Sequence, residues 1–117
     1  MSSVEKIKLR FDSAPAKVKR SAALCGVVGS GNLEILLRRG DDETGCVFEV
    51  NTSANGFGAT WESVLRDFAE NSAVGGLCVM INDMGATPAV VTLRLDQGLA
   101  MYTAVSYTHL TLPTIYS

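Results

Sequence analysis

The chain has 117 residues, a hydrophobic content of 47% and a mean hydropathy of +0.21. With 19% charged residues, this balance fits one compact domain with its own core and argues against disorder. The net charge of −2 gives no reason to expect a nucleic-acid partner. No apolar run reaches the roughly 18 to 20 residues of a membrane helix, and the N-terminus lacks the apolar core of a signal peptide. We therefore predict a cytosolic protein that binds neither nucleic acid nor membranes.

The first predicted element is a half-buried strand over residues 6–11, because apolar and basic residues alternate there. The apolar side has Ile7, Leu9 and Phe11, and the basic side has Lys6, Lys8 and Arg10. Lys17, Lys19 and Arg20 continue the basic character into a connector. A solvated strand face with a polar connector is the simpler interpretation, and a docking surface for an acidic partner is the alternative.

A run of apolar residues from 22 to 28 predicts the next strand, and residues 33–37 resume strand character after the break Gly29-Ser30-Gly31-Asn32. This pattern is typical of a hairpin or tight bend. The acidic turn over residues 40–45 has no metal-site spacing and is interpreted as a solvated loop. Two more strands are predicted at residues 46–51 and 77–81.

Two helices complete the predicted elements. The first covers residues 59–70, because its apolar residues fall at i, i+3, i+4 and i+7 and are typical of core: Trp61, Val64, Leu65 and Phe68. The second covers residues 88–102, with Thr87 as N-cap and Pro88 in the first turn. Its shared face is Val91, Leu95 and Leu99, although the alternation of Val91, Leu93 and Leu95 leaves a strand open. The element order favours an α+β two-layer sandwich, with a mainly antiparallel sheet of about five strands and two helices.

The three cysteines, Cys25, Cys46 and Cys78, are widely spaced and lie among aliphatic residues. No CxxC pair or neighbouring histidine supplies a metal site, so we predict buried free thiols with no catalytic role.

The last segment, residues 105–117, has an unusual composition. It lacks Asp, Glu, Lys and Arg, and residues 105–114 match, codon for codon, the translated read-through of a common transposon-based sequencing adapter. We therefore predict one domain over residues 1–104, with an N-terminal strand and linker in residues 1–20, and a non-native tail after it. A natural β-prone tail is the alternative. His109, the chain's one histidine, lies in the tail and is excluded from functional argument.

Few residues offer chemistry. Without His109 there is no base for a serine or cysteine nucleophile, and the glycines around residue 29 have neither dinucleotide-site nor P-loop order. Neither catalytic nor metal-binding residues are predicted. Ser30 stands out because Gly29 and Gly31 leave its hydroxyl open to a bulky modifying enzyme, and backbone N–H groups in such a bend can face a phosphate. Asn32 completes this candidate site, although a plain turn has the same pattern.

Two segments, residues 27–34 (VVGSGNLE) and 83–97 (DMGATPAVVTLRLDQ), resemble the acyl-carrier (delta) subunits of malonate decarboxylases. The resemblance spans roughly residues 24 to 99. It implies that Ser30 binds 2′-(5″-triphosphoribosyl)-3′-dephospho-coenzyme A covalently, through a phosphodiester. Two departures are visible: Asn32 replaces the usual Asp, which puts any acidic role there in doubt, and Met84 stands where an aromatic is common.

The resemblance also implies a bacterial carrier of malonate catabolism that is not itself an enzyme. A partner transferase would exchange a resting acetyl group for malonyl on the arm, and a decarboxylase partner would then convert malonyl to acetyl. A prosthetic-group transferase would attach the arm. A citrate lyase-type carrier and a non-catalytic α+β interaction module are the alternatives. The run Gly85-Ala86-Thr87-Pro88 favours the malonate family.

Overall fold

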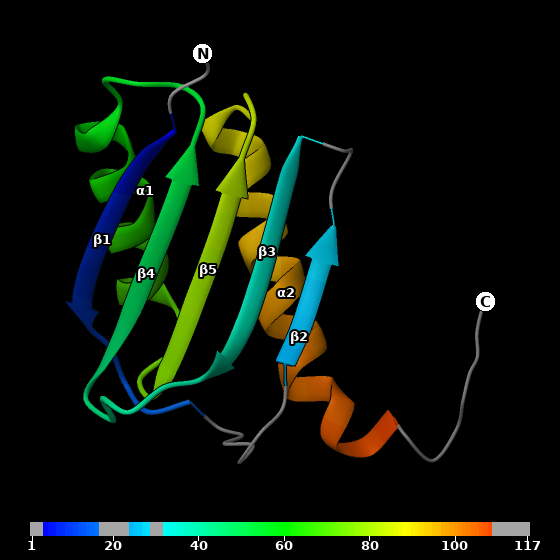
Figure 1. Ribbon diagram of the computed structural model, residues 1–117. Helices are drawn as coiled ribbons and strands as arrows, with labels where there is room; N and C mark the ends of the chain where they lie inside the picture. Colours follow the sequence, from blue (N-terminus) through cyan, green and yellow to red (C-terminus); the bar gives the residue numbers. More distant parts are fainter. Residues whose placement is uncertain (1–3, 17–23, 29–31, 109–117) are drawn as a thin grey trace.

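Five strands form one sheet in the order β1-β4-β5-β3-β2, and two helices cover one of its faces (Figure 1). The computed structural model describes residues 4–16, 24–28 and 32–108, with side chains described except at 24–28 and 104–108. The elements are β1 (Glu5–Asp12), β2 (Leu24–Val28), β3 (Leu33–Arg39), β4 (Gly45–Thr52), α1 (Gly58–Asn71), β5 (Leu77–Asp83) and α2 (Pro88–Thr108). The predicted α+β sandwich is confirmed.

Three of the four strand pairs are antiparallel: β1 with β4, β2 with β3, and β3 with β5. The predicted hairpin around the glycine-rich break is therefore confirmed, because β2 and β3 pair directly. β4 and β5 are parallel neighbours, and α1 provides the crossover between them. This places β5 in the middle of the sheet.

The alternation predicted for the first strand is confirmed, since Ile7, Leu9 and Phe11 lie half-buried against the core while the basic side chains of β1 are exposed. The structure adds a partner for one of them. The guanidinium of Arg10 donates to the carboxylates of Asp42 and, over 2.6 Å, of Asp12. The acidic turn therefore holds β1 through Arg10.

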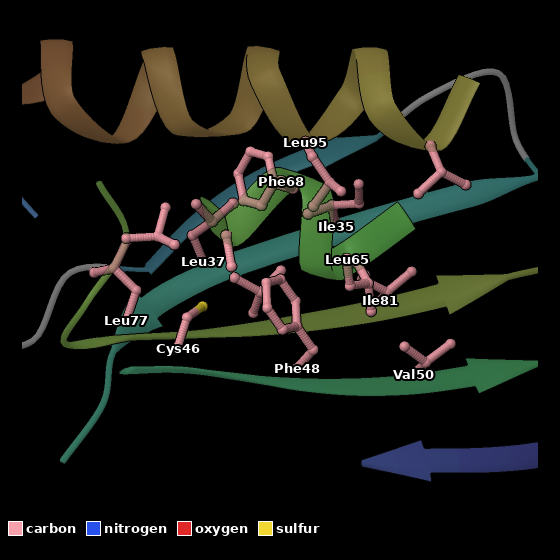
Figure 2. Close-up of a cluster of buried hydrophobic side chains, with 14 of the residues drawn as sticks. Ile35, Leu37, Cys46, Phe48, Val50, Leu65, Phe68, Leu77, Ile81 and Leu95 are labelled. Atoms are coloured by element: carbon pink, nitrogen blue, oxygen red, sulfur yellow. The ribbon is translucent and has the colours of Figure 1, made fainter. Parts of the chain in front are cut away.

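The core lies between the sheet and the helices (Figure 2). The ring of Phe48 occupies its centre, with its centroid 6.2 Å from both the Phe11 and the Phe68 ring centroids. β3, β4 and β5 alternate, so every second side chain of each enters this layer. The fully buried side chains include Ile35, Leu37, Phe48, Leu65, Leu77, Ile81, Leu95 and Tyr102.

Both helices have the predicted apolar faces. Trp61, Leu65 and Phe68 of α1 are buried, and Val64 packs against the core as a partly buried residue. In α2, Val91 and Leu95 are buried, and the Val90 N–H donates to the Thr87 hydroxyl over 3.4 Å, as expected of an N-cap. The strand alternative for this segment is wrong.

The second helix runs six residues beyond the predicted end, to Thr108, and so crosses the predicted domain boundary after residue 104. Residues 109–117, which include His109, lie outside the described residues. Within the described parts of the chain, no helix is long and apolar enough to cross a membrane.

The connector after β1 is fixed to the start of β5. Gly75 donates its N–H to the Ala14 carbonyl over 2.8 Å, and its own carbonyl accepts from the Ala16 N–H over 2.9 Å. The hydroxyl of Ser13 lies 2.9 Å from the Ala69 carbonyl at the end of α1. The described part of this connector, residues 13–16, is therefore packed against the domain.

Candidate functional site

The predicted attachment bend joins β2 to β3. Gly29, Ser30 and Gly31 lie outside the described residues, but both flanks are described. Val28 pairs with Glu34 as the last β2–β3 pair, and Leu33 pairs with Asp83 at the end of β5. The bend therefore connects an edge strand to its neighbour at the end of the sheet where β5 stops (Figure 1).

Asn32, the fourth predicted site residue, joins this bend to the loop between β5 and α2. Its carbonyl accepts the Met84 N–H over 2.8 Å. The Met84 side chain is 69% exposed, and a Cβ on the following Gly85 would meet nothing within 4 Å. Gly85 also has a φ of +110°, which favours glycine. The loop beside the bend is thus open to solvent.

The buried carboxylate of Asp83 holds that loop in place. It is 4% exposed, and its Oδ1 accepts the N–H groups of Gly85 (3.2 Å) and Ala86 (2.8 Å). Its Oδ2 accepts the hydroxyl of the buried Thr52 over 2.7 Å. Because a buried carboxylate needs such donors, these bonds fix the path of residues 83–86 and, through Met84, the start of β3.

Arg94 provides an unused donor on α2, which packs against β2 and β3, the two strands that flank the bend. Its Nη1 donates to the Gln97 side chain over 2.8 Å. Its Nε is buried, and in the described part of the chain it has no hydrogen-bond partner. A negatively charged hydrogen-bond acceptor, such as a phosphate oxygen, would give this Nε–H the partner that it lacks.

The cysteines with described side chains are buried free thiols, as predicted. Burial raises the pKa of the Cys46 thiol, with a smaller contribution from Cys78, and burial also raises the pKa of Cys78. Cys46 faces the core (Figure 2), whereas Cys78 pairs with Val47 on the opposite face of the sheet. The side chain of Cys25 lies outside the described residues. In the ranges that are described, no three His, Cys, Asp or Glu residues form a metal-binding group.

Sequence reasoning did not single out Asp83 or Arg94. Asp83 had a recognisable signal, since an Asp at a strand end, two residues before a glycine, often accepts hydrogen bonds from the backbone just after it. Arg94 had none, because helical spacing alone does not reveal which guanidinium atoms lack a partner. Both lie within the segment 83–97 that carries the resemblance.

Comparisons with known proteins agree with the resemblance. Residues 20–102 match the family model described as malonate decarboxylase delta subunit (MdcD). The malonate decarboxylase acyl carrier protein of Acinetobacter calcoaceticus is 50% identical over 99 residues, which cover 85% of this chain and 97% of that protein. Its counterpart from Burkholderia cepacia is 61% identical over 79 residues, covering 66% of this chain and 70% of that protein.

A solved structure shares the fold. It is described as a crystal structure of a Pseudomonas malonate decarboxylase hetero-tetramer in complex with malonate, and one of its chains superposes with a TM-score of 0.67 at 37% identity. The superposition covers 82% of this chain and 96% of the other. The matched segment includes the bend, the Asp83 loop and most of α2, and the chain therefore belongs to the malonate decarboxylase delta-subunit family of acyl carrier proteins.

Proposed function

We propose that this chain is the acyl-carrier subunit of a malonate-decarboxylating complex, and that Ser30 holds its arm. The observation that carries this proposal is the family match over residues 20–102, because Ser30 lies inside it. The proposed arm derives from 2′-(5″-triphosphoribosyl)-3′-dephospho-coenzyme A. When bound, it supplies a thiol that holds an acyl group as a thioester.

Attachment requires a nucleophilic oxygen with room around it. The Ser30 hydroxyl oxygen bonds to the innermost phosphorus of the triphosphate, pyrophosphate leaves, and the hydroxyl proton passes to a base of the attaching transferase. Gly29 and Gly31 add no side chains that would crowd this approach, and β2 is an edge strand. The product is the phosphodiester.

Residues of α2 and of the loop before it fit a group of this kind. Arg94 holds a buried Nε with no partner among the described residues, and a phosphate oxygen is the acceptor that it lacks. The exposed Met84 and the open space at Gly85 leave room beside the bend. These features support a phosphate-rich arm at the end of the sheet where the bend lies. The Asn32 carbonyl would hold the neighbouring loop in place through the Met84 N–H.

The proposed partners are a transferase subunit that exchanges acetyl for malonyl, a decarboxylase subunit, and the prosthetic-group transferase. The hetero-tetrameric assembly of the Pseudomonas relative supports a multisubunit complex. The chain itself contributes position, because tethering replaces a second encounter with an intramolecular one. A cytosolic location stays a prediction from the sequence.

The test is an intact-mass measurement after co-expression with the prosthetic-group synthesis and transfer enzymes. We expect the mass of one arm on the wild-type chain and none on Ser30→Ala. Ser30→Thr should accept the arm more slowly, because its added methyl crowds the transferase. Ser30→Ala should also abolish malonate turnover in the assembled complex.

Two other serines serve as controls. Ser53→Ala and Ser63→Ala change exposed hydroxyls outside the bend and should accept the arm as the wild type does. An arm that persists on Ser30→Ala, or a modified peptide that maps to Ser53 or Ser63, would refute the assignment of Ser30.

A further inference from the structure

A cavity of about 400 Å³ lies between the N-terminal turns of the two helices. The α1 side supplies Phe57, Trp61 and Val64, and the α2 side supplies Ala86, Pro88 and Val91. This volume falls within the roughly 300–1,000 Å³ of small-molecule sites, which are mostly apolar. Trp61 is 6% exposed and is the chain's one tryptophan, so the indole signals of the chain come from a residue that lines this cavity.

The charges around the cavity select against an anionic occupant. None of the described residues that line it is Lys, Arg or His, and its one charged residue is Asp83. The Asp83 oxygens are taken up by Thr52 and by the loop N–H groups. A carboxylate that entered would lose water, meet no cationic side chain and face the carboxylate of Asp83, which is unfavourable.

The cavity adjoins the attachment bend. Gly85 and Ala86 form part of its wall, and the preceding residue, Met84, donates its N–H to the Asn32 carbonyl over 2.8 Å. Since consecutive Cα atoms are about 3.8 Å apart, the wall lies on the order of 10 Å from Asn32. An arm on Ser30 with a nucleotide and a pantetheine chain is long enough to fold back over this distance.

From these observations we propose that the cavity binds the acetyl-thioester end of the arm and excludes the malonyl-thioester end. This inference rests on the proposed function. The acetyl group is small and uncharged and fits the apolar walls, whereas the malonyl carboxylate stays in water. The resting acetyl thioester is thereby sheltered from hydrolysis, and the malonyl form remains outside for the decarboxylase partner.

The experiment uses the complete chain with its arm, in the acetyl and malonyl forms, each ¹³C-labelled in the acyl group and verified by intact mass. Nuclear Overhauser effects are measured from the acyl protons to the Trp61 indole and to the methyl groups of Val64 and Val91. We expect these effects from acetyl and none from malonyl. Effects from neither form, or equal effects from both, would overturn the inference.

Two variants make the result specific. Ala86→Leu fills the cavity and should remove the acetyl contacts and speed hydrolysis of the acetyl thioester several-fold. Ala89→Leu adds the same side chain at an exposed position of α2 and should leave both unchanged. Contacts that survive in a folded Ala86→Leu chain would place acetyl elsewhere and contradict the proposal.

A second measurement does not depend on the arm. The unmodified chain is titrated with S-acetylpantetheine and, separately, with S-malonylpantetheine, and the same Trp61 and valine signals are followed. We expect shifts with the acetyl compound alone, and no shifts with either would count against the cavity. If the proposed function is wrong, the peptide that contains Ser30 will lack the mass of the arm. If only the cavity inference is wrong, that mass will be present but the acetyl signals will be absent.

Discussion

At the residue scale, Asp83 holds the loop beside the bend through three accepted hydrogen bonds. Asp83→Ala should lower the free energy of unfolding by about 1–3 kcal/mol, because the buried Thr52 hydroxyl loses its acceptor and a buried donor without a partner costs roughly that much. Asp83→Asn keeps one acceptor oxygen for the loop N–H groups and should lose clearly less. Urea unfolding measures both variants. Equal losses would mean that the carboxylate oxygens do not fix the loop.

The two described cysteines give a second prediction at this scale. Burial raises the pKa of the Cys46 and Cys78 thiols, so at pH 8 both are protonated and poor nucleophiles. In a Cys25→Ala chain, we expect very slow reaction with a disulfide reagent in the folded state and rapid reaction in urea. Fast reaction of either thiol in the folded chain would contradict this prediction and reopen the possibility of a nucleophilic role.

At the element scale, Gly75 lets the connector after β1 approach β5. A Cβ there would lie 2.6 Å from the Ser13 carbonyl oxygen and 3.0 Å from that of Ala14, so backbone would have to move. We expect Gly75→Ala to cost about 1–3 kcal/mol in thermal or urea unfolding. Gly58→Ala is the matched control, because a Cβ at the first position of α1 meets nothing within 4 Å. A neutral Gly75→Ala would show that the connector is loosely held.

The contact between Arg10 of β1 and the turn before β4 predicts a pH dependence. Hydrogen bonds from Arg10, and then from Thr44, hold the pKa of Asp42 at about 2, below its usual 3.8. Because the pKa of Asp42 is lower in the folded than in the unfolded chain, its ionised carboxylate stabilises the fold at pH values above the unfolded-state pKa of 3.8. This contribution is lost as the pH falls through about 2. Asp42→Asn should therefore lower Tm modestly at pH 6 and hardly at all near pH 2.

The control for this pH series is Asp67→Asn, which removes a carboxylate from the exposed face of α1. Its Tm difference from wild type should not follow the same acid-dependent course. If the Asp42→Asn difference were constant between pH 6 and pH 2, the Arg10 contact would not stabilise the folded chain.

The elements that could be predicted from the sequence are those with a regular apolar period. The alternation of Ile7, Leu9 and Phe11 and the helical stripe from Trp61 to Phe68 depend on near neighbours in the chain, and both predictions are confirmed. The parallel pairing of β4 with β5 and the face of the sheet on which Cys78 is buried were not predictable. They depend on which distant strands meet, as does the pairing of Arg10 with Asp42 across 32 positions.

In the candidate site, too, local features could be predicted from the sequence and long-range contacts could not. Ser30 is predicted from the sequence because glycines flank it and because the segment around it resembles a family motif, and it lies outside the described residues. The link from Asn32 to Met84, the hydrogen bond from Thr52 to Asp83 and the Arg94 Nε without a partner among the described residues were not predictable, because each depends on how separate elements meet. The helical stripe predicted as core is also the wall of a cavity, since Trp61 and Val64 line it.

At the scale of the whole molecule, we propose that the natural sequence in this chain stops near Ala104 and that residues 105–117 are not native. The family model ends at residue 102, and Tyr102 is fully buried and would be retained. If this is so, deleting residues 105–117 should leave the Tm unchanged or raise it, because a non-native segment was never selected to stabilise the domain. Differential scanning calorimetry measures this. A loss of more than about 5 °C, roughly 1 kcal/mol for a domain of this size, would show that the segment contributes to the fold.

The central position of β5 also constrains how the chain is made. β5 is the fifth strand to leave the ribosome, yet it lies between β4 and β3. Until residues 77–83 emerge, the β1–β4 pair and the β2–β3 hairpin have no strand between them, and each exposes an unpaired inner edge. Such edges promote aggregation of nascent chains. Because every pairing with β5 closes a long loop, we expect folding to follow synthesis and to be slow compared with helical domains of similar length.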